Sequence, residues 1–245
     1  MINKSMIYQS ILELSGKKKM LALLIDPEET GVEKVPRLLK HACDAGVSFI
    51  LVGGSLVNHP IDAFVNNIRE HSSLPVILFP GNPNQLTGNA DGLLLLSLIS
   101  GRNPEFLIGN HVVAAQFLRR SSLEIIPTGY MLIENGNASS AEYISNTKPL
   151  PRNKSEIAIS TAIAGELLGL KLIYIEGGSG ACGIVPPGLI SAVKENISIP
   201  LIVGGGIRTS EELLKVFDAG ADIAVIGNAI EHNPELLEEF SKVLK

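Results

Sequence analysis

The stretch "LKLIYIEGGSGACG", residues 170–183, passes from a dense apolar run into a loop built on glycine. Its apolar part lacks regular polar alternation, which is typical of a strand buried on both faces of a parallel sheet. Two reactive side chains, Tyr174 and Glu176, stand where the run ends. The stretch therefore predicts a buried parallel strand that leads into a functional loop.

Seven further apolar runs have the same character, and most are separated by segments with helical spacing, such as residues 32–46. These runs begin at Met20, Val47, Pro75, Asp91, Leu123, Ile199 and Ala221. Eight strand–helix units within about 250 residues predict an α/β fold, the (β/α)₈ or TIM barrel, as a single domain over residues 1–245. A doubly wound open sheet is the competing architecture, but it seldom has eight such regular units.

Two connections depart from the regular pattern. Only "GNPNQLTGNA", residues 81–90, separates the third and fourth runs, and this is too short for a full crossover helix. The third helix of the barrel is therefore expected to be reduced or missing. A long polar insertion, residues 134–155, follows the fifth run and suggests a lid or an interface.

Composition excludes several classes of protein. The net charge of −5 provides no basic field for a polyanion, so nucleic acid is not an expected partner. No run approaches the roughly 18 apolar residues of a membrane span, and the first residues lack the order of a signal peptide, so we expect a cytoplasmic protein. Aromatic residues make up 4% with no Trp, which disfavours a cage of stacked rings around a carbocation.

Glycine clusters end three successive runs, at residues 176–180, 203–208 and 226–228. Active sites of such barrels form at the carboxyl ends of the strands, and the loops after the seventh and eighth strands are the usual phosphate site. Without a Cβ, glycine lets backbone N–H groups approach an anion. The clusters therefore predict an anion site, although glycines could also serve only to make tight turns.

Asp26 and Ser55 end the first two runs and supply two hard oxygen ligands of the kind that suits Mg²⁺. Either residue also suits a helix N-cap. As a pair from neighbouring strands they favour a metal site on the side of the barrel mouth opposite the glycine clusters.

The segments "LIDPEE", "LVGGS", "YIEGGSGA", "VGGGIR" and "IGNAIE", in this order, resemble the geranylgeranylglyceryl phosphate synthase family over nearly the whole chain. The resemblance implies a prenyltransferase that moves a polyprenyl group, such as geranylgeranyl, from its diphosphate to the 3-hydroxyl of sn-glycerol 1-phosphate. It assigns Mg²⁺ and the departing diphosphate to Asp26 and Ser55. It assigns glycerol phosphate to Tyr174, Ile175, Glu176, Gly177, Gly178, Ser179, Gly180, Gly205, Gly206, Gly227 and Asn228.

Within this assignment, Glu176 either accepts the proton of the glycerol hydroxyl, stabilises positive charge on the allylic carbon, or only orients the ligand, and Tyr174 offers a phenol donor. The resemblance also implies a homo-oligomer, a dimer or hexamer, with Tyr143 of the insertion in a subunit interface. Because the product is a lipid, transient membrane contact is expected at its release. The alternative function is a metal-independent isomerase or lyase on a phosphate-binding barrel.

Overall fold

The computed structural model describes residue 4 and residues 6–244, and it contains a closed barrel of eight parallel strands. Neighbouring strands pair in chain order, and β8 pairs with β1 to close the barrel. The strands are β1 (Met20–Ile25), β2 (Phe49–Val52), β3 (Val76–Leu78), β4 (Gly92–Leu98), β5 (Glu124–Leu132), β6 (Leu172–Glu176), β7 (Leu201–Gly204) and β8 (Ile223–Ile226). The (β/α)₈ prediction is confirmed, and each of the eight apolar runs contains one strand.

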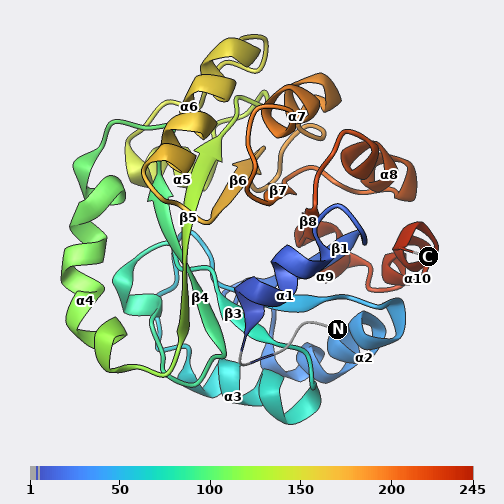
Figure 1. The fold of residues 1–245 in the computed structure, drawn as a ribbon. Coiled ribbons are helices and arrows are strands. Elements are labelled where there is room, and N and C mark those ends of the chain that lie inside the picture. The colour runs from blue at the N-terminus through green and yellow to red at the C-terminus, as the bar shows by residue number, and fades with distance from the viewer. Residues whose placement is uncertain (1–3, 5, 245) are drawn as a thin grey trace.

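Helices surround the barrel (Figure 1). They are α1 (Ile7–Leu14), α2 (Val35–Ala45), α3 (Asp62–His71), α4 (Asn110–Arg120), α5 (Ser140–Ser145), α6 (Ser155–Leu167), α7 (Pro187–Lys194), α8 (Ser210–Asp218), α9 (Asn228–His232) and α10 (Leu236–Leu244). The chain also forms the 3₁₀ turns η1 (Val32–Lys34) and η2 (Pro83–Gln85) and the π-helix η3 (Glu105–Gly109). None of the helices in the described part of the chain combines the length and hydropathy needed to cross a bilayer.

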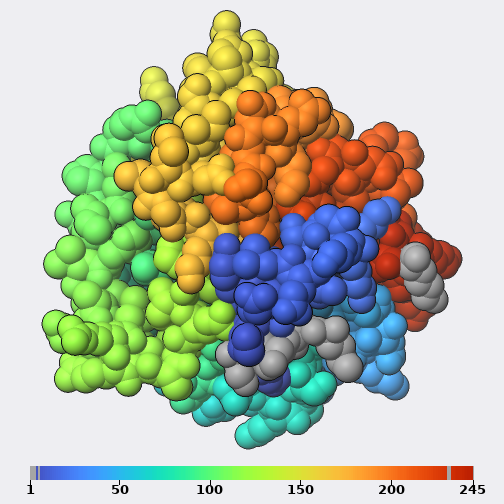
Figure 2. Space-filling model, in the orientation of Figure 1, coloured from blue at the N-terminus to red at the C-terminus, as the bar shows by residue number. Residues whose placement is uncertain are grey.

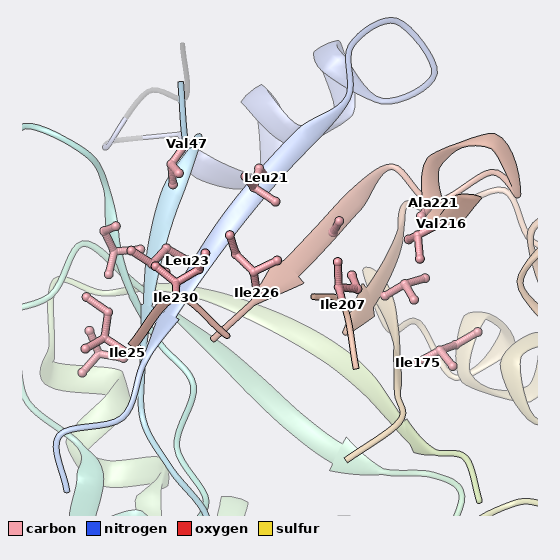
Figure 3. Packing of buried hydrophobic residues seen from close by; sticks show 14 of the residues in the cluster. Leu21, Leu23, Ile25, Val47, Ile175, Ile207, Val216, Ala221, Ile226 and Ile230 are labelled. Carbon is pink, nitrogen blue, oxygen red and sulfur yellow. The ribbon is translucent and has the colours of Figure 1, made fainter. Parts of the chain in front are cut away.

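Side chains alternate between two separate hydrophobic cores because successive strand residues point to opposite faces. On β1, Leu21, Leu23 and Ile25 face outward and pack in the layer between strands and helices (Figure 3). Met20 and Ala22 face the barrel interior and pack with the inward residues of the other strands. Both cores are apolar, which explains why the strand sequences show no polar alternation.

Helix α1 closes the amino-terminal end of the barrel. Ile7 and Ile11 are fully buried against the interior core, and the helix lies across the barrel end, where its residues cover the centre of the molecule (Figures 1 and 2). Burial of each isoleucine contributes about 1.5–3 kcal/mol. The barrel interior is thereby sealed at this end.

Glu124, the first residue of β5, anchors the start of α1. Its carboxylate accepts hydrogen bonds from the backbone N–H groups of Ile7 and Tyr8, at 2.9 Å for Tyr8, and so replaces the absent side-chain N-cap of this helix. We expect Glu124→Ala to lower the free energy of unfolding by about 1–2 kcal/mol, the usual cost of a lost cap. Urea denaturation measures this loss, with Glu13→Ala on the exposed side of α1 as the control. Equal stabilities of the two variants would contradict the anchoring role.

Two connections differ from the others. Between β3 and β4 the chain forms only the three-residue 3₁₀ turn η2. Between β5 and α6 the chain makes an isolated bridge from Ile133 to Leu150 and folds the intervening residues around α5. Both connections leave the carboxyl ends of their strands, so they border the same end of the barrel.

Candidate active site

A cleft of about 940 Å³ opens at the carboxyl ends of the strands. It brings together nearly all of the residues singled out in the sequence, from strands on opposite sides of the barrel. Those that line it are Asp26, Ser55, Tyr174, Glu176, Gly178, Ser179, Gly180, Gly205, Gly206, Gly227 and Asn228. Ile175 and Gly177 are not among the lining residues.

The positions of Ile175 and Gly177 follow from the geometry of β6. Tyr174 and Glu176 are two residues apart and face the interior, so Ile175 between them faces outward and packs in the strand–helix core (Figure 3). The N–H of Gly177 donates to the carbonyl of Gly204 at 3.0 Å and so extends the pairing of β6 with β7. This N–H is therefore already used within the protein.

The glycine loops after β6 and β7 pack directly against each other. Gly206 has a φ of 77°, and a Cβ added there would lie 2.0 Å from the carbonyl oxygen of Gly183. Gly205 has a φ of 87°, and its added Cβ would lie 2.4 Å from Glu176 Oε1. Only glycine fits both positions, because of the left-handed backbone and the close approach.

Side chains link the remaining loops on this side of the cleft. Asn228, the first residue of α9, donates from Nδ2 to the hydroxyl of Ser179 at 3.1 Å, so the loops after β6 and β8 touch. Arg208 lines the cleft, and its guanidinium donates to the carbonyl of Ala181. The three glycine loops thus form one continuous wall with polar groups at its edge.

Glu176 is a buried carboxylate at the end of β6, with 7% of its surface exposed. Its Oε1 accepts a hydrogen bond from the N–H of Gly178 at 2.7 Å. Burial raises the pKa of Glu176, and this hydrogen bond, together with the proximity of the Tyr174 hydroxyl, opposes the rise. A carboxyl with a raised pKa in a cleft is suited to exchange a proton with a ligand.

Tyr174 carries a buried hydroxyl next to this carboxylate. A Cβ added to Gly204 would lie 2.5 Å from Tyr174 Oη and 2.7 Å from Glu176 Oε2, which places the two oxygens side by side. The hydroxyl makes no hydrogen bond to a described residue that meets both the distance and the angle criteria. Burial raises the pKa of Tyr174 well above its ordinary value, and the Glu176 carboxylate adds to the rise, so the phenol stays a donor.

Three aromatic rings meet at the floor of the cleft, a cluster that the low aromatic content did not suggest. Tyr130 is the register partner of Tyr174, and their ring centroids lie 5.3 Å apart in an edge-to-face arrangement. Phe79 stacks on Tyr174 at 5.3 Å and contacts Tyr130 at 5.7 Å. Both Phe79 and Tyr130 sit near the ends of their strands, and this position was the signal available in the sequence.

Asp26 and Ser55 follow β1 and β2, so they line the cleft beside the loop after β8 and across the barrel from the loop after β6. Neither caps a helix, since the N-cap residues of η1, α2 and α3 are Gly31, Lys34 and Ile61. Asp26 Oδ1 accepts from the N–H of Glu28 at 2.9 Å. Burial raises the pKa of Asp26, this hydrogen bond opposes the rise, and the carboxylates of Glu29 and Glu28 add to it.

An apolar groove of about 850 Å³ continues from the cleft between β4, the η2 connection and the inner face of α4. Five residues line both spaces: Gly54, Ser55, Phe79, Tyr130 and Ala141. The groove itself is lined mainly by Leu86, Leu93, Leu94, Leu95, Leu96, Leu98, Phe106, Ala114, Leu118 and Ile144. A polar cleft and an apolar groove thus meet at Ser55 and the aromatic rings.

Helix α5 of the long insertion borders both spaces. Ala141 lines the cleft and the groove, and the carbonyl of Ser145 is held by Asn103 Nδ2 at 2.7 Å. Tyr143 points away and is 86% exposed. The insertion therefore lies at the rim of the site.

The closed barrel and its mouth define a (β/α)₈ protein with a two-part ligand site at the carboxyl ends of the strands. This chain belongs to the PcrB family, whose model matches residues 15–244. The family resemblance drawn from the sequence motifs is confirmed.

Known geranylgeranylglyceryl phosphate synthases are similar to this chain over almost their whole length. The chain is 47% identical over 234 residues to the geranylgeranylglyceryl phosphate synthase of Spirosoma linguale, covering 95% of this chain and 94% of the relative. The structure of the wild-type synthase (GGGPS) of Thermoplasma volcanium superposes with a TM-score of 0.92 at 34% identity, covering 98% and 97% of the two chains. The Thermoplasma acidophilum synthase, solved in complex with its substrate sn-glycerol-1-phosphate, gives 0.91 at 31% identity over 98% of both chains.

Proposed function

We propose that this protein is a prenyltransferase, a geranylgeranylglyceryl phosphate synthase. It transfers a geranylgeranyl or similar polyprenyl group from the diphosphate to the 3-hydroxyl of sn-glycerol 1-phosphate and releases diphosphate. The observation that carries this proposal is the junction of a glycine-walled polar cleft with an apolar groove at Ser55, Phe79 and Tyr130. This junction suits a reaction between a small phosphate ester and the head of a long apolar chain.

The glycine wall is proposed to bind the glycerol phosphate. Gly178, Gly180, Gly205 and Gly206 expose backbone at the cleft surface, where N–H groups can reach phosphate oxygens. Gly227 and Asn228 add the turn that begins α9, and Ser179 adds a hydroxyl. Ile175 contributes through the outer packing of β6 and not through its side chain, which lies in the strand–helix core.

Asp26 and Ser55 fit a magnesium site of the kind that retains most of its waters. Such sites use one or two carboxylates together with substrate phosphates, and among residues 4 and 6–244 no cluster of three His, Cys, Asp or Glu side chains offers a full protein cage. A Cβ added to Gly54 would lie 2.1 Å from Asp26 Oδ2, so the carboxylate abuts the turn that carries Ser55. Bound there, Mg²⁺ would offset negative charge on the departing diphosphate, a contribution of several kcal/mol.

The apolar groove is proposed to hold the prenyl tail. Burial of each CH₂ contributes about 0.8 kcal/mol, so leucine-lined walls can retain a long chain. We infer that the η2 connection stands in for the third helix of the barrel, because its shortness leaves the flank of β4 open to this groove. A connection with a full helix would cover the same flank.

Glu176 is proposed to accept the proton of the glycerol 3-hydroxyl as its oxygen bonds to the allylic carbon of the prenyl group. The carbon–oxygen bond to the diphosphate breaks, and the electron pair leaves with the diphosphate. We propose that the buried Tyr174 hydroxyl, which lies beside Glu176, donates to a ligand oxygen there. The proton thus passes to Glu176, the prenyl group passes to the glycerol oxygen, and diphosphate leaves.

Product analysis tests the reaction. We expect incubation with sn-glycerol 1-phosphate, Mg²⁺ and a mixture of prenyl diphosphates to give one prenyl ether by mass spectrometry, with release of diphosphate. Asp26→Ala should lower kcat/KM by about 100-fold or more, because leaving-group stabilisation is lost. The sn-glycerol 3-phosphate enantiomer is the control substrate. Turnover of a sugar phosphate that is unaffected by EDTA would instead favour the metal-independent isomerase or lyase.

Three other features stay predictions. A dimer or hexamer with Tyr143 in a subunit interface is consistent with the 86% exposure of that ring, and light scattering of the protein and of Tyr143→Ala would decide it. The cytoplasmic location is expected from the sequence, and the transient membrane contact is expected because the product of the proposed reaction is a lipid. No nucleic acid takes part in it.

A further inference from the structure

The η2 connection carries a buried amide that belongs to neither the cleft nor the groove. Gln85 is 1% exposed and lines neither space. Burying a side-chain amide costs free energy unless its N–H donors and its oxygen acceptor form hydrogen bonds. Its side-chain amide is hydrogen-bonded to the backbone of two neighbouring turns.

Gln85 holds Gly54 through both of that residue's backbone polar groups. Its Nε2 donates to the carbonyl of Gly54 at 2.8 Å, and its Oε1 accepts from the N–H of Gly54 at 3.3 Å. The same Oε1 accepts from the N–H of Gly81 at 3.3 Å. The amide therefore fixes the turn after β2 to the turn after β3.

The turn that Gln85 holds lies against Asp26 and carries Ser55. A Cβ added to Gly54 would lie 2.1 Å from Asp26 Oδ2, and one added to Gly81 would lie 3.1 Å from Ser55 Cα. No side chain separates the turn from either residue. A shift of Gly54 would accordingly change the spacing between the Asp26 carboxylate and the Ser55 hydroxyl.

We propose that Gln85 is a positioning residue that sets the geometry of Asp26 and Ser55 for a prenyl diphosphate with its divalent cation. This inference rests on the proposed function. Gln85 acts through the backbone of Gly54 and does not touch the ligand. Because displacements of about 1 Å suffice to impair a site of this kind, loss of the amide should weaken diphosphate binding and leave the loops after β6 and β7, across the barrel, unchanged.

Calorimetric titration of the full chain tests the proposal without turnover. The probes are geranylgeranyl thiolodiphosphate, which reacts slowly, with excess Mg²⁺, and separately sn-glycerol 1-phosphate. Gln85→Met removes the three hydrogen bonds at similar volume. Thr87→Val is the matched control, since Thr87 is buried in the same connection but donates to Asp62 of α3 at 2.7 Å.

For Gln85→Met we expect the Kd of the thiolodiphosphate to rise about tenfold, in line with the loss of one or two well-placed contacts, and the Kd of glycerol phosphate to stay unchanged. Thr87→Val should change neither. Equal weakening of both ligands, or unchanged binding of the thiolodiphosphate, would overturn the positioning role.

Two further outcomes are distinguishable. If Gln85→Met does not fold, Gln85→Asn keeps an amide that is one methylene too short to reach both turns, and the same pair of Kd values decides the matter. If the wild-type protein itself fails to bind the thiolodiphosphate with Mg²⁺, the proposed function and the role of Gln85 fall together. If the wild type binds the thiolodiphosphate normally and the Gln85 variant binds it equally well, only the positioning role of Gln85 is disproved.

Discussion

Replacing Glu176 by glutamine is expected to lower kcat by about 10²–10⁴-fold, the usual contribution of a positioned general base. Glutamine keeps an oxygen that can accept from the Gly178 N–H, so the loop geometry and glycerol phosphate binding should change little. Steady-state kinetics with product quantification measures the effect. Glu195→Gln, which removes an exposed carboxylate on the outer surface after α7, is the control for loss of charge alone.

The pH dependence provides a second test of the same group. Burial raises the pKa of Glu176 above the ordinary glutamate value of about 4.3. A base must be deprotonated, so activity is present above this pKa and is lost as the pH falls through it. The acid limb of kcat/KM should therefore lie above the ordinary glutamate range. An unchanged kcat with a raised KM in Glu176→Gln would assign this carboxylate to orientation only.

Gly206→Ala is expected to have the other large effect. The new Cβ would lie 2.0 Å from the carbonyl oxygen of Gly183 at a backbone φ of 77°, so the loops after β6 and β7 must separate. We expect a loss of about 1–3 kcal/mol in the free energy of unfolding. A fall on the order of 100-fold in kcat/KM for glycerol phosphate should accompany it, because the amides proposed to bind the phosphate are displaced.

Gly183→Ala is the matched control for this contact. A Cβ added at Gly183 meets no atom within 4 Å, although its carbonyl is the group that Gly206 approaches. The two substitutions add the same methyl group on either side of one contact, and only one of them collides. Urea denaturation and kinetics of both variants measure the difference. Similar behaviour of the two would show that the close packing of these loops is not needed for binding.

The sequence predicted the barrel because the pattern that defines it is local. Each strand is a short apolar run, and each run is read without knowledge of its neighbours in space. The ends of these runs also predicted that Asp26, Ser55 and Glu176 would lie near one another, and they line one cleft, since parallel strands in a closed barrel deliver all their carboxyl ends to one mouth. The cleft was therefore predictable from chain order.

Contacts between residues distant in sequence were not predictable in the same way. The pairing of Tyr130 with Tyr174 depends on the register of β5 and β6, and the stacking of Phe79 depends on the turn that follows β3. Low aromatic content argued against a ring cluster, but it gives an average over the chain and says nothing about where the few rings gather. Ile175 was included in the site as part of a motif, whereas the alternation of side chains along β6 turns it outward.

Because α1 closes the amino-terminal end of the barrel, it limits the routes by which ligands can reach and leave the site. Ile7 and Ile11 pack against the interior core at that end, so a ligand of the cleft enters and leaves at the carboxyl ends of the strands. A lipid formed at the junction of the polar cleft and the leucine-lined groove would have its head in the cleft and its tail in the groove. Helix α5 borders both spaces through Ala141, so a product with its head in the cleft and its tail in the groove would lie beside this helix until it is released.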